Sequence, residues 1–140
     1  MMRLVREVVS KVVLTCLMCT TVAFASSTLP SRTSDGGGVR VVVTPKPHNL
    51  NAATWDFEVV LDTHTKPLTD DLAAASSLID NQGRAIPAKL WKGDPPGGHH
   101  RKGILQFPVP SNSHSAVELR VQGVGGVDVR TFRWDVRSQD

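Results

Sequence analysis

Thr54-Trp55-Asp56-Phe57-Glu58-Val59-Val60-Leu61 is the stretch that decides the fold. Its large apolar residues recur at every second position, and two acidic residues stand between them. Side chains on a β-strand alternate between its two faces, so this pattern indicates a strand with one buried face and one solvated face. The face that we expect in the core consists of Trp55, Phe57, Val59 and Leu61.

Six further segments are short, β-branched or alternating, and are bounded by Gly, Pro, Asn or Asp. They cover residues 39–44, 77–80, 85–91, 103–107, 117–122 and 129–136. About seven short strands with frequent turn signals are typical of an antiparallel β-sandwich of immunoglobulin-like type. We therefore predict one all-β domain over residues 39–137, with Trp55 and Trp134 in its core and Pro87 at an edge or bulge.

The first 25 residues have the pattern of a secretory signal peptide. Three basic residues precede an uncharged apolar run over residues 12–24, and Ala23-Phe24-Ala25 fits the cleavage site. The expected location is secreted or periplasmic, and the alternative is a membrane anchor formed by an uncleaved segment. Residues 26–38 are rich in Ser, Thr and Gly, and we predict a flexible linker there.

Removal of the signal peptide changes how charge and cysteine content are interpreted. Both cysteines, Cys16 and Cys19, lie inside the apolar run, so the mature chain has none and forms no disulfide. The signal peptide holds three of the 16 basic residues and one of the 13 acidic residues, which leaves a net charge of +1. A chain so close to neutral, without basic residues clustered among aromatics, gives no indication of nucleic-acid binding.

Residues 91–101, Trp-Lys-Gly-Asp-Pro-Pro-Gly-Gly-His-His-Arg, form the most specified loop of the chain. If consecutive strands are antiparallel, this loop lies at the same pole of the sandwich as Asp62 and His64, which follow the strand over 54–61. The glycine-rich turn Gly123–Gly126 returns to that pole as well. The two other histidines, His48 and His114, are expected at the far pole.

Four motifs give the chain a resemblance to a known group of proteins. They are Asp62-Thr63-His64, Pro95–Arg101, Gly123–Gly126 and Thr131-Phe132-Arg133-Trp134. The chain resembles a family of exported prokaryotic domains that is known only as uncharacterised. The resemblance implies a β-sandwich and export, and it brings no activity, ligand or catalytic residue.

We call the pole that carries His64 and the 91–101 loop the near pole. Two interpretations concern the chemistry of the polar cluster expected there, which consists of Asp62, His64, Asp94, His99, His100 and Arg101. In the structural one, histidines donate to loop carbonyls and Arg101 pairs with Asp62 or Asp94, so that a polar network fixes three loops. In the other, the cluster binds copper or zinc, because imidazole and carboxylate groups are suitable ligands for these ions. The candidate ligands are His64, His99, His100, Asp62 and Asp94.

A third interpretation is a module that binds a protein partner, such as another exported or membrane protein. Its contact residues would be Trp91, His99 and Arg101, since aromatic residues and arginine often anchor interfaces. Catalysis is the least supported class, because no nucleophile, base and orienting acid are arranged in a recognisable motif. We therefore expect a non-enzyme and assign no catalytic residue.

Overall fold

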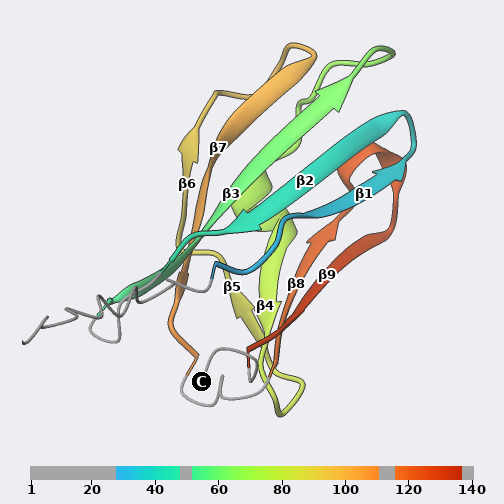
Figure 1. Cartoon of the computed structure of the whole chain (residues 1–140). Helices are drawn as coiled ribbons and strands as arrows, with labels where there is room; N and C mark the ends of the chain where they lie inside the picture. The colour runs from blue at the N-terminus through green and yellow to red at the C-terminus, as the bar shows by residue number, and fades with distance from the viewer. Residues whose placement is uncertain (1–27, 48–51, 111–115, 137–140) are drawn as a thin grey trace, which may run out of the picture.

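The computed structural model describes residues 28–47, 52–110 and 116–136. These residues form two antiparallel sheets packed face to face (Figure 1). The five-stranded sheet has the order β1-β2-β3-β7-β6, and the four-stranded sheet has the order β5-β4-β8-β9. The strands are β1 (Arg32–Gly36), β2 (Val39–Pro45), β3 (Thr54–Thr63), β4 (Ser76–Ile79), β5 (Ala85–Pro87), β6 (Leu90–Gly93), β7 (His100–Pro108), β8 (Ala116–Gln122) and β9 (Val129–Asp135).

The connectivity is that of an immunoglobulin-like sandwich. The order β2-β3-β7-β6 reproduces the order of the first immunoglobulin sheet, A-B-E-D, and β4-β8-β9 reproduces the second, C-F-G. Strand β5 extends the second sheet beside β4, and β1 adds an outer strand beside β2. The predicted fold class is therefore confirmed, with nine strands among the described residues in place of about seven.

One of the two additional strands comes from the segment over residues 85–91, which was predicted as a single strand. The chain changes sheets inside it, because Ala88 N donates to Ser76 O of β4 and Lys89 N donates to Gln106 O of β7. Pro87, which has no N–H to donate, ends β5 just before the change. The segment therefore gives β5 in one sheet and β6 in the other.

The other additional strand is β1, which lies within the segment that was predicted as a flexible linker. Residues 32–36 pair with β2 from Arg32 opposite Val43 to Gly36 opposite Val39. The composition indicated a linker because β1 has no large apolar residue. Its pairing with β2 depends on its main chain. The linker prediction is therefore wrong for residues 32–36, which form the edge of the domain.

The core lies between the two sheets and contains the predicted face of β3. Trp55, Phe57, Val59 and Leu61 are each at most 1% exposed. Trp134 of β9 is equally buried, and its ring centroid lies 5.6 Å from that of Phe57. Both tryptophans that were predicted to lie in the core are thus confirmed there.

Two short helical turns complete the described structure. Helix α1 (Leu72–Ala75) begins after Asp71, whose side chain accepts from the N–H groups of Ala73 and Ala74. The 3-10 turn η1 (Val124–Gly126) joins β8 to β9. No helix in the described part of the chain is long and apolar enough to cross a bilayer.

Candidate functional site

The near pole of the sandwich is formed by the ends of β3 and β7 and the loops around them. Thr63 N donates to His99 O over 3.0 Å, and Leu68 N donates to Gly98 O over 2.9 Å. Gly97 N donates in return to Leu68 O over 2.7 Å. The predicted meeting of the His64 segment with the His99-His100 loop at one pole is therefore confirmed. His48 and His114 lie outside the described residues.

Arg101 is buried at this pole, with 1% of its surface exposed. Its guanidinium donates to three main-chain carbonyls, those of Leu68 at 3.2 Å, Asp70 at 2.7 Å and Asp94 at 3.3 Å. Burial lowers the pKa of this guanidinium, and nearby carboxylates oppose that effect. The prediction that Arg101 pairs with the side chain of Asp62 or Asp94 is therefore wrong, because its acceptors are main-chain carbonyls. Its expected contact with a partner is wrong as well, because a buried side chain cannot reach one.

Trp91 is half-buried beneath Arg101, with the guanidinium 5.6 Å from the ring centroid. Its Nε1 donates to the carbonyl of Asp94 over 2.9 Å. The ring covers Gly93 and Gly103, which face each other across β6 and β7, and a Cβ at either position would meet it at 2.7 Å. Trp91 therefore packs over this glycine pair, and its bond to the Asp94 carbonyl holds the start of the loop.

Asp94 also serves the loop itself. Its side chain accepts from Lys102 N over 2.8 Å, and its own N–H donates to Lys102 O over 3.0 Å. Of the polar loop residues, His64, His99 and His100 are exposed, and the carbonyl of His99 is used in the contact with Thr63.

A row of charged side chains crosses the outer face of the five-stranded sheet near this pole. The strand registers place Asp35 opposite Arg40, Arg40 opposite Asp62, and Asp62 opposite His100. Arg40 Nε donates to Asp35 Oδ1 over 2.8 Å, and His100 Nδ1 lies 2.5 Å from Asp62 Oδ1. Acidic and basic groups therefore alternate across four neighbouring strands, and we call these four residues the charged row.

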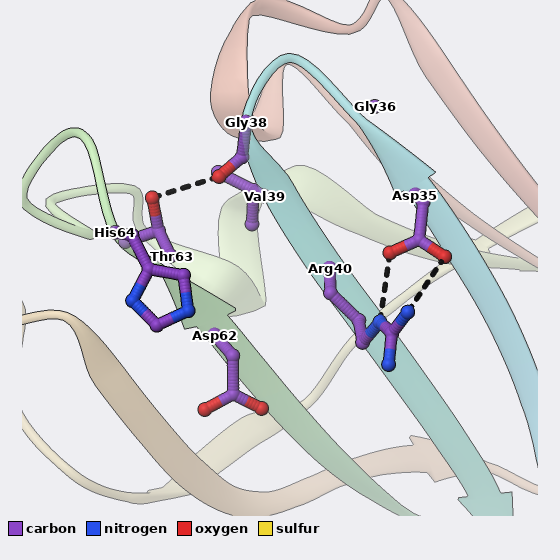
Figure 2. Close-up of a pocket in the computed structure, with 8 residues that line it drawn as sticks. All are labelled: Asp35, Gly36, Gly38, Val39, Arg40, Asp62, Thr63 and His64. Carbon is purple, nitrogen blue, oxygen red and sulfur yellow. Dashed lines mark hydrogen bonds and ion pairs between the residues drawn. The ribbon is translucent and has the colours of Figure 1, made fainter.

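A hollow of about 610 Å³ lies beside the charged row (Figure 2). Asp62 and His64 stand on one side of it, and Asp35 and Arg40 stand on the other. The remaining lining residues are Gly36, Gly38, Val39 and Thr63, and Thr63 Oγ1 donates to Gly38 O. Sequence analysis identified Asp62 and His64 as site residues. It missed Asp35, which it placed in a linker, and Arg40, which it placed in the strand over residues 39–44.

The structure does not gather the predicted metal ligands. No three His, Asp or Glu side chains among the described residues lie close enough together to hold a metal ion, and all five candidates belong to that part of the chain. Asp62 and His100 are the two candidate ligands whose side chains contact each other. The side chain of Asp94 accepts from Lys102 N. Asp94 follows β6, which lies on the opposite side of β7 from β3, and the end of β3 lines the hollow.

A second buried arginine escaped the sequence analysis. Arg130 of β9 is 2% exposed and donates to the carbonyls of Gly36, Ser34 and Val124. It also donates to Ser34 Oγ over 3.1 Å. A signal was present in the sequence, because Arg130 is in phase with Phe132 and Trp134 on the buried face of β9.

Comparisons with known proteins add little to this description. No family model matches the sequence, and no curated protein matches it. Among solved structures, the chain is similar to a DUF4426 family protein from Pseudomonas aeruginosa. The identity is 20% and the TM-score is 0.44, over 74% of this chain and 93% of that chain. A likeness of this size supports no argument about function.

Proposed function

We propose that this chain is an exported, non-catalytic immunoglobulin-like domain whose buried polar cluster is structural and whose exposed charged row recognises a protein partner. The observation that carries the structural part is the bonding of Arg101. Its Nη1 and Nη2 atoms donate to carbonyls from the 68–70 segment and from the loop after β6. A guanidinium committed in this way joins two loops and is not available to a ligand.

The recognition part depends on the exposed groups that the structural network does not use. Asp35 and Arg40 retain about 60% of their side-chain exposure although they pair with each other. His100 and Asp62 are 59% and 46% exposed. A partner with charges of the opposite pattern can exchange these weak surface pairs for pairs across an interface, which favours specificity and fast association.

The partner that we propose is another exported or membrane protein, because the signal-like segment at residues 1–25 directs the mature domain to the same compartment. That segment lies outside the described residues. Expression of the full chain followed by mass measurement of the exported form tests this step. The expected mature protein begins at Ser26, and retention of the whole chain in the cytoplasm would contradict export.

Site-specific photocrosslinking in the exporting cell tests recognition. We would place the crosslinking residue at His64 in the hollow and, as a control, at Gln82 in the exposed turn of the opposite pole. The expected result is a discrete protein adduct at His64 that is absent at Gln82 and is lost when Arg40→Glu is added. Equal adducts at both positions, or none at His64, would contradict the proposal.

Copper and zinc binding is the alternative that the same residues suggested, and calorimetry decides between the two. We would titrate each ion into the mature domain and into a His64→Ala/His99→Ala/His100→Ala variant. The expected result is no one-to-one binding in either protein. Sub-micromolar binding that is lost in the variant would replace the recognition proposal with a metal site.

A further inference from the structure

The side of the sandwich where β1 lies against β9 has the features of a binding site for an extended strand. Strand β1 pairs with β2 along its length, and the opposite edge of the site is β9 (Figure 1). Segments far apart in sequence meet here. Donors on β9 bond to acceptors on the N-terminal segment that lie about a hundred residues earlier in the chain.

The donors of this site recognise main-chain groups. Arg130 Nη1 donates to Ser34 O over 3.1 Å, and Nη2 donates to Gly36 O over 2.7 Å. Trp134 Nε1 donates to Pro30 O over 2.6 Å. Arg130 and Trp134 are both buried with the strand in place, and the guanidinium of Arg130 is also held by its bond to Val124 O of η1.

The strand itself contributes little to the core. The residues of β1 are exposed or half-buried, and the apolar contact of this segment comes from Leu29, which packs against the core just before the strand. A strand that is polar on both faces is specified weakly and is prone to alternative pairing or exchange. The site therefore binds the main chain of β1 and one apolar side chain, that of Leu29. Every copy of the chain can supply both.

The connection between β1 and β2 is a turn of two glycines. Gly36 pairs with Val39, so Gly37 and Gly38 alone make the turn, and both have positive φ. A turn this short closes only in a narrow set of backbone angles. If the turn opened, β1 would extend away from β2 and the site would be free.

We propose that the site formed by β2, Arg130 and Trp134 accepts the Leu29–Gly36 segment of a second copy of this chain, which gives a strand-exchanged dimer. With the native turn, proximity favours the strand of the same chain. Exchange therefore requires the turn to open, and shortening the turn converts the monomer to the dimer.

The first test deletes Gly37 and Gly38 from the mature chain and adds cysteines at Thr33 and Val42, which pair across β1 and β2. The expected product is a dimer with disulfides between chains. The native-length turn with the same cysteines is expected to give a disulfide within one chain. A folded monomer of the deletion variant would overturn the proposal.

The second test keeps the native turn and decides the matter if the deletion variant does not fold. A Thr33→Cys chain and a Val42→Cys chain are mixed, warmed to just below the unfolding midpoint, cooled and oxidised. A linked heterodimer is expected, and Trp134→Phe in the Val42→Cys chain is expected to lower its yield about fivefold, as for one net hydrogen bond. A yield no greater than that of Thr33→Cys mixed with Thr131→Cys, a position on the exposed face of β9, would overturn the proposal.

Discussion

The two buried arginines of the described residues, Arg101 and Arg130, both donate to main-chain carbonyls, at different places in the domain. Each donates to carbonyls of two segments. Arg101 joins the 68–70 segment to the loop after β6, and Arg130 joins β1 to η1. A buried carbonyl without a donor costs free energy, and a guanidinium has five donors in a fixed plane. One side chain therefore bonds to several segments at once, and its loss removes a donor from each of them.

Arg101→Met is expected to lower the free energy of unfolding by about 2 kcal/mol. It keeps most of the side-chain volume but removes the donor to the Asp70 carbonyl, whereas the carbonyls of Leu68 and Asp94 keep their bonds from Gly97 N and Trp91 Nε1. Urea unfolding followed by tryptophan fluorescence measures this. Arg40→Met is the control, since Arg40 is exposed and its pair with Asp35 contributes little. Equal losses in the two variants would show that Arg101 has no special structural role.

Asp80 makes the stability of the domain depend on pH. Its carboxylate accepts from Arg84 N, Arg84 Nε and Gln82 N, and these bonds lower its pKa below the ordinary 3.8. The unfolded chain then binds protons first as the pH falls, so stability is full above about pH 4 to 5 and is lost on acidification. Asp80→Asn is expected to flatten this dependence between pH 5 and pH 2.5.

The control for that measurement is Asp128→Asn, which changes an exposed carboxylate in the turn before β9. It is expected to leave the pH dependence as in the unmodified domain. If both variants keep the same slope in acid-dependent urea unfolding, another carboxylate is responsible for it.

At the scale of the elements, the near pole is built by turns that bring main chains very close together. Gly37 in the β1–β2 turn lies against Gly125 of η1, so that a Cβ at Gly37 would stand 2.0 Å from Gly125 O. The same region contains Val124, whose carbonyl accepts from Arg130. The turn, η1 and β9 therefore form one packed unit.

A pair of glycine substitutions separates backbone strain from this close approach. Gly37→Ala is expected to cost about 3 kcal/mol, from positive φ and the clash with Gly125 together. Gly83→Ala also has positive φ, but its Cβ meets open space, so about 1 kcal/mol is expected. Thermal unfolding of the two variants gives the difference, and similar midpoints would contradict the packing at Gly37.

Alternation along the strands allowed the sequence to predict the sheets, and it also shows where prediction stopped. The face of β3 follows from Trp55 and Phe57 directly, since apolar residues at every second position need a core. The change of sheet after Pro87 and the pairing of β1 involve main-chain bonds, which leave no apolar pattern. The topology argument placed His64 near the His99-His100 loop correctly, because antiparallel order alone decides which pole a loop reaches.

Side-chain roles at the pole were harder to predict than positions. Arg101 and Arg130 were overlooked as core residues although each is in phase with a buried face, since a charged residue is expected at the surface. The charged row likewise needed the register of four strands, including β1, and no single stretch of sequence contains it.

At the scale of the whole molecule, β1 protects the edge of the five-stranded sheet. The sequence of β2, Val-Arg-Val-Val-Val-Thr-Pro, has strong β-propensity, and without β1 its main-chain groups would be open to another chain. Exposed edges of this kind pair with one another and aggregate. Polar residues on both faces of β1 suit it to be the outermost strand.

Two truncated forms of the chain test this role. A form that begins at Thr28 retains β1 and is expected to stay soluble. A form that begins at Gly37 exposes β2 and removes the carbonyls of Ser34 and Gly36 that accept from Arg130. The second form is expected to be less stable, and light scattering at equal concentration is expected to detect large assemblies. If both forms are monomeric and unfold at the same urea concentration, residues 28–36 behave as a linker, and the domain begins at β2.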